Sequence, residues 1–192
     1  MASYRYFLRY RSLIYHFIRL PFQLYSVKKP ISNSESPIIP HSINFILPMN
    51  ILILCTGNSC RSQMAQGLLQ SLDKSLNVCS AGTAPATQVN TKAIDVMKEL
   101  GIDISNHVPT NVETYLDQEW DYVITVCDHA NETCPAFTGK VKKRIHLGFD
   151  DPSQKTGTED FIHAEFCRVR DEIKNVFTHF YITEILKSKQ NI

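Results

Sequence analysis

A short apolar strand, a polar turn and a helix follow one another in the first half of the chain, and no other feature constrains the fold as strongly. The run Ile51–Leu54 has the length and composition of a buried strand, and it ends at Cys55. Gly57 and Asn58 then indicate a turn, and residues 61–69 have helical spacing. A loop that opens a helix directs backbone N–H groups and the positive end of the helix dipole at its interior. The sequence therefore predicts an oxyanion site in this loop.

Cys55 and Arg61 stand six positions apart at the two ends of the loop. This spacing places the sulfur at the floor of the loop and the guanidinium over the oxygens of a ligand. We expect the Cys55 thiol to ionise readily, because the N–H groups, the helix dipole, the guanidinium and nearby serine hydroxyls all favour a thiolate, which is the nucleophilic form. An inert thiol at a strand end is the alternative. The remaining candidate loop residues are Thr56, Gly57, Asn58, Ser59, Cys60 and Ser62.

The bulk composition excludes several classes of protein. The chain of 192 residues is 43% hydrophobic and 20% charged, as in an ordinary globular protein, and it lacks the phosphate-binding loop pattern of nucleotide-binding proteins. Residues 49–192 hold 14 basic and 18 acidic residues, which disfavours nucleic acid as a partner. Six cysteines are too few for a disulfide scaffold, and no run reaches the roughly 18 apolar residues of a membrane span. We expect a soluble, cytoplasmic monomer without a membrane or nucleic-acid partner.

Residues 1–48 differ from the rest of the chain. They hold six basic residues against one acidic residue, together with five prolines, and they end just before Met49 and the first clear strand. We predict a poorly ordered basic and aromatic extension over residues 1–48 and a catalytic domain over residues 49–192. An organelle presequence, a membrane-surface helix over residues 4–24 and a true start at Met49 are alternatives.

From Met49 onward, strand and helix patterns alternate. Further strands are expected over residues 78–82, 121–126 and 144–147, and helices over residues 62–72, 91–100, 112–118 and 159–186. Gly101 is expected to end the second helix. The alternation predicts an α/β fold with a parallel sheet covered on both faces and an active site at the carboxyl ends of the strands. Cys55 and Cys127 both lie at such ends.

Cys127 and Cys134 form a second group of interest, seven positions apart. A redox relay would let Cys127 resolve an oxidised Cys55 and let Cys134 resolve the resulting disulfide. Unrelated buried thiols are one alternative, and a zinc site with His129 that lacks a fourth ligand is another. We assign no metal ligand. The remaining histidines show neither ligand spacing nor a partner; they include His107, His146, His163 and His179.

Asp151 precedes Pro152 in a loop after the last expected strand. A carboxylate there can lean over the catalytic loop and give a proton to a leaving oxygen. We prefer Asp151 to Asp150 because proline restricts the residue before it to an extended geometry. A surface turn is the alternative.

These motifs together resemble the thioredoxin-coupled arsenate reductases, which share the fold of low-molecular-weight protein tyrosine phosphatases. The matching stretches are residues 55–65, 80–82, 148–152 and 168–173, with Cys127 and Cys134–Pro135. The resemblance implies a four-stranded parallel sheet flanked by helices on both faces, and reduction of arsenate to arsenite in arsenic detoxification. It also implies roles: Cys55 attacks arsenate, Asp151 protonates the departing hydroxyl, and Cys127 and then Cys134 pass a disulfide to thioredoxin.

One departure from the family concerns a bound ion. Some relatives hold a potassium ion with residues matching Asn58, Gln66 and Ser80, but a glutamine replaces the acid here, so we assign no cofactor. The alternative function is a phosphatase that works through a Cys55 phospho-enzyme. Gln63 in place of a frequent proline, the absence of paired tyrosines after Pro152, and the cysteine pair favour the reductase.

Overall fold

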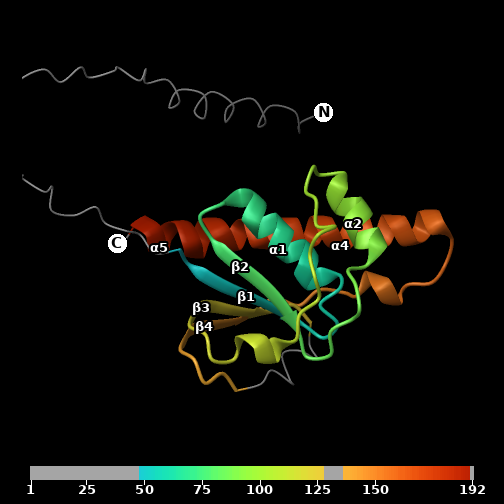
Figure 1. The fold of residues 1–192 in the computed structure, drawn as a ribbon. Coiled ribbons are helices and arrows are strands. Elements are labelled where there is room, and N and C mark those ends of the chain that lie inside the picture. Colours follow the sequence, from blue (N-terminus) through green and yellow to red (C-terminus); the bar gives the residue numbers. More distant parts are fainter. Residues whose placement is uncertain (1–47, 128–135, 191–192) are drawn as a thin grey trace, which may run out of the picture. The chain divides into compact units, whose positions relative to one another are not determined.

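A four-stranded parallel sheet forms the centre of residues 48–127 and 136–190, the part of the chain that this computed structural model describes (Figure 1). Its strands are β1 (Asn50–Cys55), β2 (Asn77–Gly82), β3 (Trp120–Thr125) and β4 (Val141–His146), in the spatial order β2-β1-β3-β4. The helices are α1 (Arg61–Leu72), α2 (Thr91–Lys98), α4 (Glu159–Phe180) and α5 (Leu186–Gln190), with short segments η1 (Val112–Tyr115), η2 (Pro152–Gln154) and the π-helical η3 (Tyr181–Ile185). The predicted fold class is confirmed.

Both faces of the sheet are buried, which explains why β1 is apolar at successive positions. Side chains of a strand alternate between the two faces. Ile51 and Ile53 pack into the core formed with α1, α2 and α4, which lie together on one side of the sheet in Figure 1. Leu52 and Leu54 pack on the opposite side with Trp120 and with η1.

The ends of α2 follow local sequence signals. The Asn90 side chain accepts hydrogen bonds from two N–H groups of the first turn. At the other end Gly101 has φ of +73°, and the N–H of Ile102 donates to the carbonyl of Met97 at 3.1 Å. This left-handed termination is available to glycine without a Cβ clash, and the prediction that Gly101 ends the helix is confirmed.

The long C-terminal helical region also follows its apolar pattern. Thr158 caps α4 by accepting a hydrogen bond from the Phe161 N–H at 3.3 Å. The helical region continues through η3 into α5, close to the predicted end at residue 186. The buried face of α4 contains Phe166, Val169, Ile173, Phe177 and Phe180, as predicted, whereas Val176 is half-buried.

β4 begins three residues before the predicted start at Arg144. The sequence Val141–Arg144 is basic and lacks strand-like alternation, but β4 is bonded only to β3 within the described sheet, so its lysines extend into solvent. Lys142 pairs with Asp121 at 2.6 Å and Lys143 with Glu184 at 2.5 Å.

Some predictions fall outside the described ranges. Residues 1–47 of the predicted extension lie there, and so do His129 and Cys134. Within residues 48–127 and 136–190, no helix has the length and hydropathy that crossing a membrane requires.

Candidate active site

The loop between β1 and α1 is held in place through its carbonyl groups. The carbonyls of Cys55, Thr56, Gly57 and Ser59 accept hydrogen bonds from the N–H groups of Thr83, Ala84, Ala86 and Asn90, at 2.8–3.3 Å. The Asn58 carbonyl accepts one from the Gln63 side chain at 2.9 Å. Because the C=O and N–H of a trans peptide point in opposite directions, these bonds leave the loop N–H groups facing inward. This arrangement suits an oxyanion.

Two residues allow the loop to turn this tightly. Asn58 has φ of 45°, in the left-handed region that asparagine tolerates better than most residues. Its side-chain NH₂ donates to the hydroxyls of Ser62 and Ser80 at 2.9 and 2.8 Å, which fixes the turn to α1 and β2. Gly82 lies so close to the loop that a Cβ there would stand 2.4 Å from the Thr56 carbonyl oxygen.

Cys55 is buried at the floor of the loop, with 3% of its surface exposed. Its sulfur accepts a hydrogen bond from the Asn58 N–H at 3.0 Å and lies 3.0 Å from the Ser62 hydroxyl. Since the Asn58 side chain donates to that hydroxyl oxygen, the proton of Ser62 is free to point at the sulfur. A thiolate at Cys55 would therefore receive two hydrogen bonds.

The expectation that Cys55 ionises readily is wrong for this environment. Burial is the largest influence and raises the pKa of Cys55 above its usual value. The hydrogen bonds from Ser62 and Asn58 and the charge of Arg61 lower that pKa, but they do not offset burial, and the nearby Cys127 raises it further. Formation of the Cys55 thiolate therefore depends on these hydrogen bonds and on Arg61.

Arg61 joins the loop to the segment after β4. Its Nη2 forms a 2.5 Å ion pair with the Asp151 carboxylate, and its Nη1 donates to the Phe149 carbonyl at 3.0 Å. Its Nε is buried and has no hydrogen-bond partner among the described residues. A buried guanidinium N–H without a partner is costly, so Arg61 retains a donor for an anion held in the loop.

The structure distinguishes Asp151 from its neighbour Asp150. Asp151 faces Arg61 and also accepts hydrogen bonds from the backbone and hydroxyl of Ser153, at 3.0 and 2.6 Å. Asp150 points instead to Arg168 on α4, at 3.0 Å. The carboxylate preferred from the sequence is therefore the one next to the loop.

Cys127 lies directly beyond β3, buried, with its sulfur 3.5 Å from the hydroxyl of Thr56. The structure thus brings together Cys55, Arg61, Asp151 and Cys127 from three separate parts of the chain. Cys60 is buried in the same region, where burial and then the charge of Asp151 raise its pKa strongly. Its thiol is consequently a poor nucleophile.

The residues that match the potassium site of some relatives do not fit a cation. The Ser80 hydroxyl accepts from Asn58 and donates to Gln66 Oε1 at 2.7 Å, and the Gln66 NH₂ donates to the Val78 carbonyl at 3.2 Å. Asn58 Oδ1 accepts from the Thr110 N–H at 2.8 Å. These oxygens already have partners and none carries a charge, so hydrogen bonds link the loop to β2 here.

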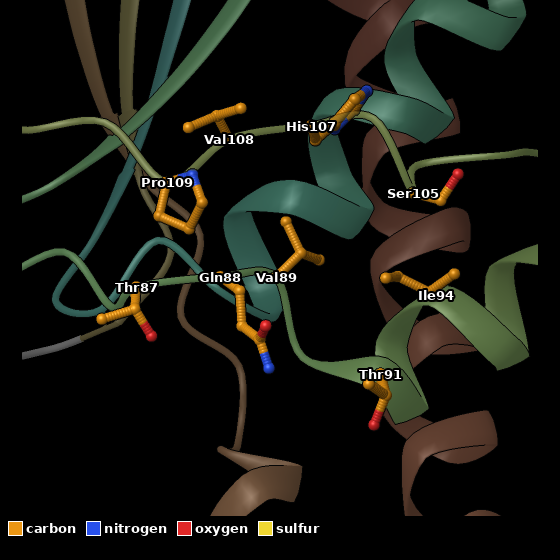
Figure 2. Close-up of a pocket in the computed structure, with 9 residues that line it drawn as sticks. All are labelled: Thr87, Gln88, Val89, Thr91, Ile94, Ser105, His107, Val108 and Pro109. Atoms are coloured by element: carbon orange, nitrogen blue, oxygen red, sulfur yellow. The ribbon is translucent and has the colours of Figure 1, made fainter.

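No sequence motif indicated the layer of side chains behind the loop. There His107 Nδ1 lies 2.9 Å from Gln63 Oε1, and the Gln63 side chain in turn holds the Asn58 carbonyl. Figure 2 shows His107, Val89 and Pro109 among the residues around a pocket of about 300 Å³. Neither Cys55 nor Arg61 lines this pocket, so the reacting groups lie elsewhere.

Comparisons with known proteins agree with this geometry. The profile of the low molecular weight phosphotyrosine protein phosphatase family matches residues 50–191. The chain belongs to this family. Among its relatives in the family, an arsenate reductase of Halalkalibacterium halodurans is 49% identical over 124 residues, which are 64% of this chain and 88% of that protein.

Solved structures of the phosphatase family show the same fold. An arsenate reductase in the phosphate binding state has a TM-score of 0.59 at 27% identity, over 69% of this chain and 95% of that one. The YwlE arginine phosphatase from Geobacillus stearothermophilus has a TM-score of 0.58 at 26% identity, over 74% of this chain and 96% of that one. This low molecular weight phosphatase family member is therefore an enzyme whose relatives include reductases and phosphatases.

Proposed function

We propose that this chain reduces arsenate to arsenite through a relay of Cys55, Cys127 and Cys134 that thioredoxin resets. The observation that supports it most directly is the 3.5 Å separation between the Thr56 hydroxyl and the Cys127 sulfur. It puts a second thiol beside the oxyanion loop, where a phosphatase needs none. The relative from Halalkalibacterium halodurans, named arsenate reductase, supports the same activity.

The first step is attack on arsenate. The oxyanion is held by the inward N–H groups of the loop and by Arg61, and the Cys55 thiolate forms a bond to arsenic. One arsenic–oxygen bond breaks: Asp151 takes up the proton that the Cys55 thiol loses and donates it to that oxygen, which leaves as water. Arsenic is still pentavalent at this point.

The second step transfers the electrons. The Cys127 thiolate attacks the Cys55 sulfur, the sulfur–arsenic bond breaks, and its electron pair stays on arsenic, which leaves as trivalent arsenite. Cys134 then attacks Cys127 and frees Cys55 as a thiolate, and the thioredoxin dithiol reduces the Cys127–Cys134 disulfide. Since reduced thioredoxin is required, we place the enzyme in the cytoplasm, and we propose that it acts as a monomer in arsenic detoxification.

A phosphatase is the second candidate, and the family supports it, as does the likeness to an arginine phosphatase. Phosphate and arsenate are both tetrahedral oxyanions, so Cys55, Arg61 and Asp151 would perform the same first step on a phosphate ester. Water would then hydrolyse the phospho-cysteine. Cys127 and Cys134 would have no part in that reaction.

The test is thioredoxin-dependent turnover by the full chain. With arsenate, thioredoxin, its reductase and NADPH, wild type should consume NADPH, and Cys127→Ser and Cys134→Ser should each stop turnover. Cys79→Ser, which removes a half-buried thiol from β2, is the matched control and should turn over normally. If the Cys127 and Cys134 variants turn over arsenate like wild type and phosphate esters are hydrolysed rapidly, the phosphatase replaces the reductase.

A further inference from the structure

Glu99, His163 and Cys167 converge on the surface between α2 and α4. Glu99 caps the end of α2, and His163 and Cys167 lie one helical turn apart on α4, so both face the same way. One possible metal-ligand atom from each residue lies within 4.8 Å of the others. Within residues 48–127 and 136–190, these three residues form the group of His, Cys and acidic side chains that could hold a metal ion. None of the three residues has a role in the mechanism proposed above.

The two separations at His163 are close to the edges of a tetrahedral zinc site. His163 Nε2 lies 3.1 Å from Glu99 Oε1 and 3.5 Å from Cys167 Sγ, and that sulfur lies 3.7 Å from Glu99 Oε2. Zinc bonds of about 2.0–2.1 Å to nitrogen and oxygen and about 2.3 Å to sulfur place ligand atoms about 3.3–3.6 Å apart. His163 Nε2 thus lies within a few tenths of an ångström of the required separation from Glu99 Oε1 and from the sulfur, and the three donor atoms are within 4.8 Å of one another.

Arg170 supports the carboxylate in this arrangement. Its Nη1 donates to Glu99 Oε2 at 2.6 Å and to the Val96 carbonyl at 3.0 Å, which fixes the rotamer of Glu99 and leaves Oε1 directed at His163. Ligating carboxylates are commonly held by such a second hydrogen bond. The charge of Arg170 is itself balanced by Asp171, at 2.9 Å, so it does not oppose a cation strongly.

We propose that Glu99, His163 and Cys167 bind a zinc ion that links the end of α2 to α4. A thiolate, an imidazole and one carboxylate are the donors that zinc accepts, whereas magnesium and calcium require more oxygen ligands. The thiolate and the carboxylate balance the two charges of the ion. Glu99 and His163 are exposed, so the site is open to solvent and a water can complete the tetrahedron.

The test uses Co²⁺ as a spectroscopic probe and Zn²⁺ as its competitor, with the reduced full chain. Wild type should bind one Co²⁺ with thiolate-to-cobalt charge-transfer absorption, and one equivalent of Zn²⁺ should remove that absorption. Cys167→Ser should abolish the band, and His163→Asn should weaken binding by about tenfold or more. Zn²⁺ should also raise the Tm of wild type but not of His163→Asn.

Two controls separate this site from other thiols and histidines. His179→Asn, an exposed histidine on the same helix, should bind the metal like wild type. The double variant Cys127→Ser/Cys134→Ser removes the other cysteines considered for zinc and should keep the charge-transfer band. The proposal is overturned if wild type does not bind Co²⁺, if the band survives in Cys167→Ser, or if it disappears in the double variant.

Discussion

The Cys127 sulfur lies 3.5 Å from the hydroxyl of Thr56, the residue that follows Cys55. This proximity is set by the sheet, because β1 and β3 are hydrogen-bonded neighbours and the Val126 N–H donates to the Leu54 carbonyl at 2.8 Å. Buried parallel strands fix their register strongly. The strand register therefore holds the Cys127 sulfur beside the residue that follows Cys55.

Replacing Thr56 with valine should slow the release of arsenite. The variant loses the hydrogen bond to Cys127, which at about 1 kcal/mol corresponds to roughly a fivefold lower rate for the second step. Single-turnover arsenite release measures this step, and alkylation of Cys55 should be unaffected. The control is Thr138→Val, which removes a hydroxyl that donates to the Leu116 carbonyl instead of to a thiol; it should behave as wild type. An unchanged rate in Thr56→Val would mean that this contact does not position Cys127.

Ser62→Ala should make Cys55 less reactive at neutral pH. The variant removes a hydrogen bond to the sulfur, so the pKa of Cys55 rises further above its usual value and the thiolate fraction falls. Alkylation at pH 7 should slow by about tenfold and recover as pH is raised. Ser71→Ala, also on α1 but bonded to the Leu68 carbonyl, serves as the matched control. The same pH profile in Ser62→Ala and wild type would contradict this role.

Asp73 should contribute stability that depends on pH. Burial alone would raise the pKa of Asp73, but bonds from Lys189 and Ser75 hold it well below its usual value. Because the pKa of Asp73 is lower in the folded state, its carboxylate stabilises the fold at pH values above its pKa in the unfolded chain, about 3.9. This stabilisation is lost as the pH falls. Asp73→Asn should therefore lower the free energy of unfolding by about 1 kcal/mol at pH 7. Thermal melts should show that difference shrinking below about pH 4; a constant difference would refute the linkage.

Potassium should have no specific effect on the wild-type enzyme. The neutral chain of Asn58, Ser80 and Gln66 satisfies its own oxygens, so activity and Tm should be equal in KCl and NaCl at the same ionic strength. Gln66→Glu introduces the missing charge and should gain a preference for potassium in Tm. A potassium-specific gain in the wild type would show that the site accepts the ion after all.

The elements of the fold could be predicted where local signals were strong. The buried run before Cys55 and the glycine at 101 each indicate their local structure within a few residues. The basic start of β4 carried no such signal, since only its position beside β3 makes it a strand. Tertiary context decides whether such a segment at the edge of a sheet forms a strand.

The candidate site was predictable in its residue types but not in its energetics. Spacing and strand position placed Cys55, Arg61 and Cys127 at one end of the sheet, and the structure brings them together. The pKa of Cys55 depends on how deeply the loop is buried, which no motif encodes. The pairing of Glu99 with His163 and Cys167 was also missed, because it joins residues 64 and 68 positions apart.

The relay is tested most directly by trapping its first disulfide in the full chain with Cys134→Ser. One equivalent of arsenate should oxidise this variant once, release one equivalent of arsenite and leave a disulfide between Cys55 and Cys127. Peptide mass spectrometry without reduction, after quenching with an alkylating agent, identifies the bonded pair. Stoichiometric arsenite with the Cys55–Cys127 disulfide is the predicted result; arsenite release with Cys127 still free, or with Cys55 bonded to Cys60, would contradict the account.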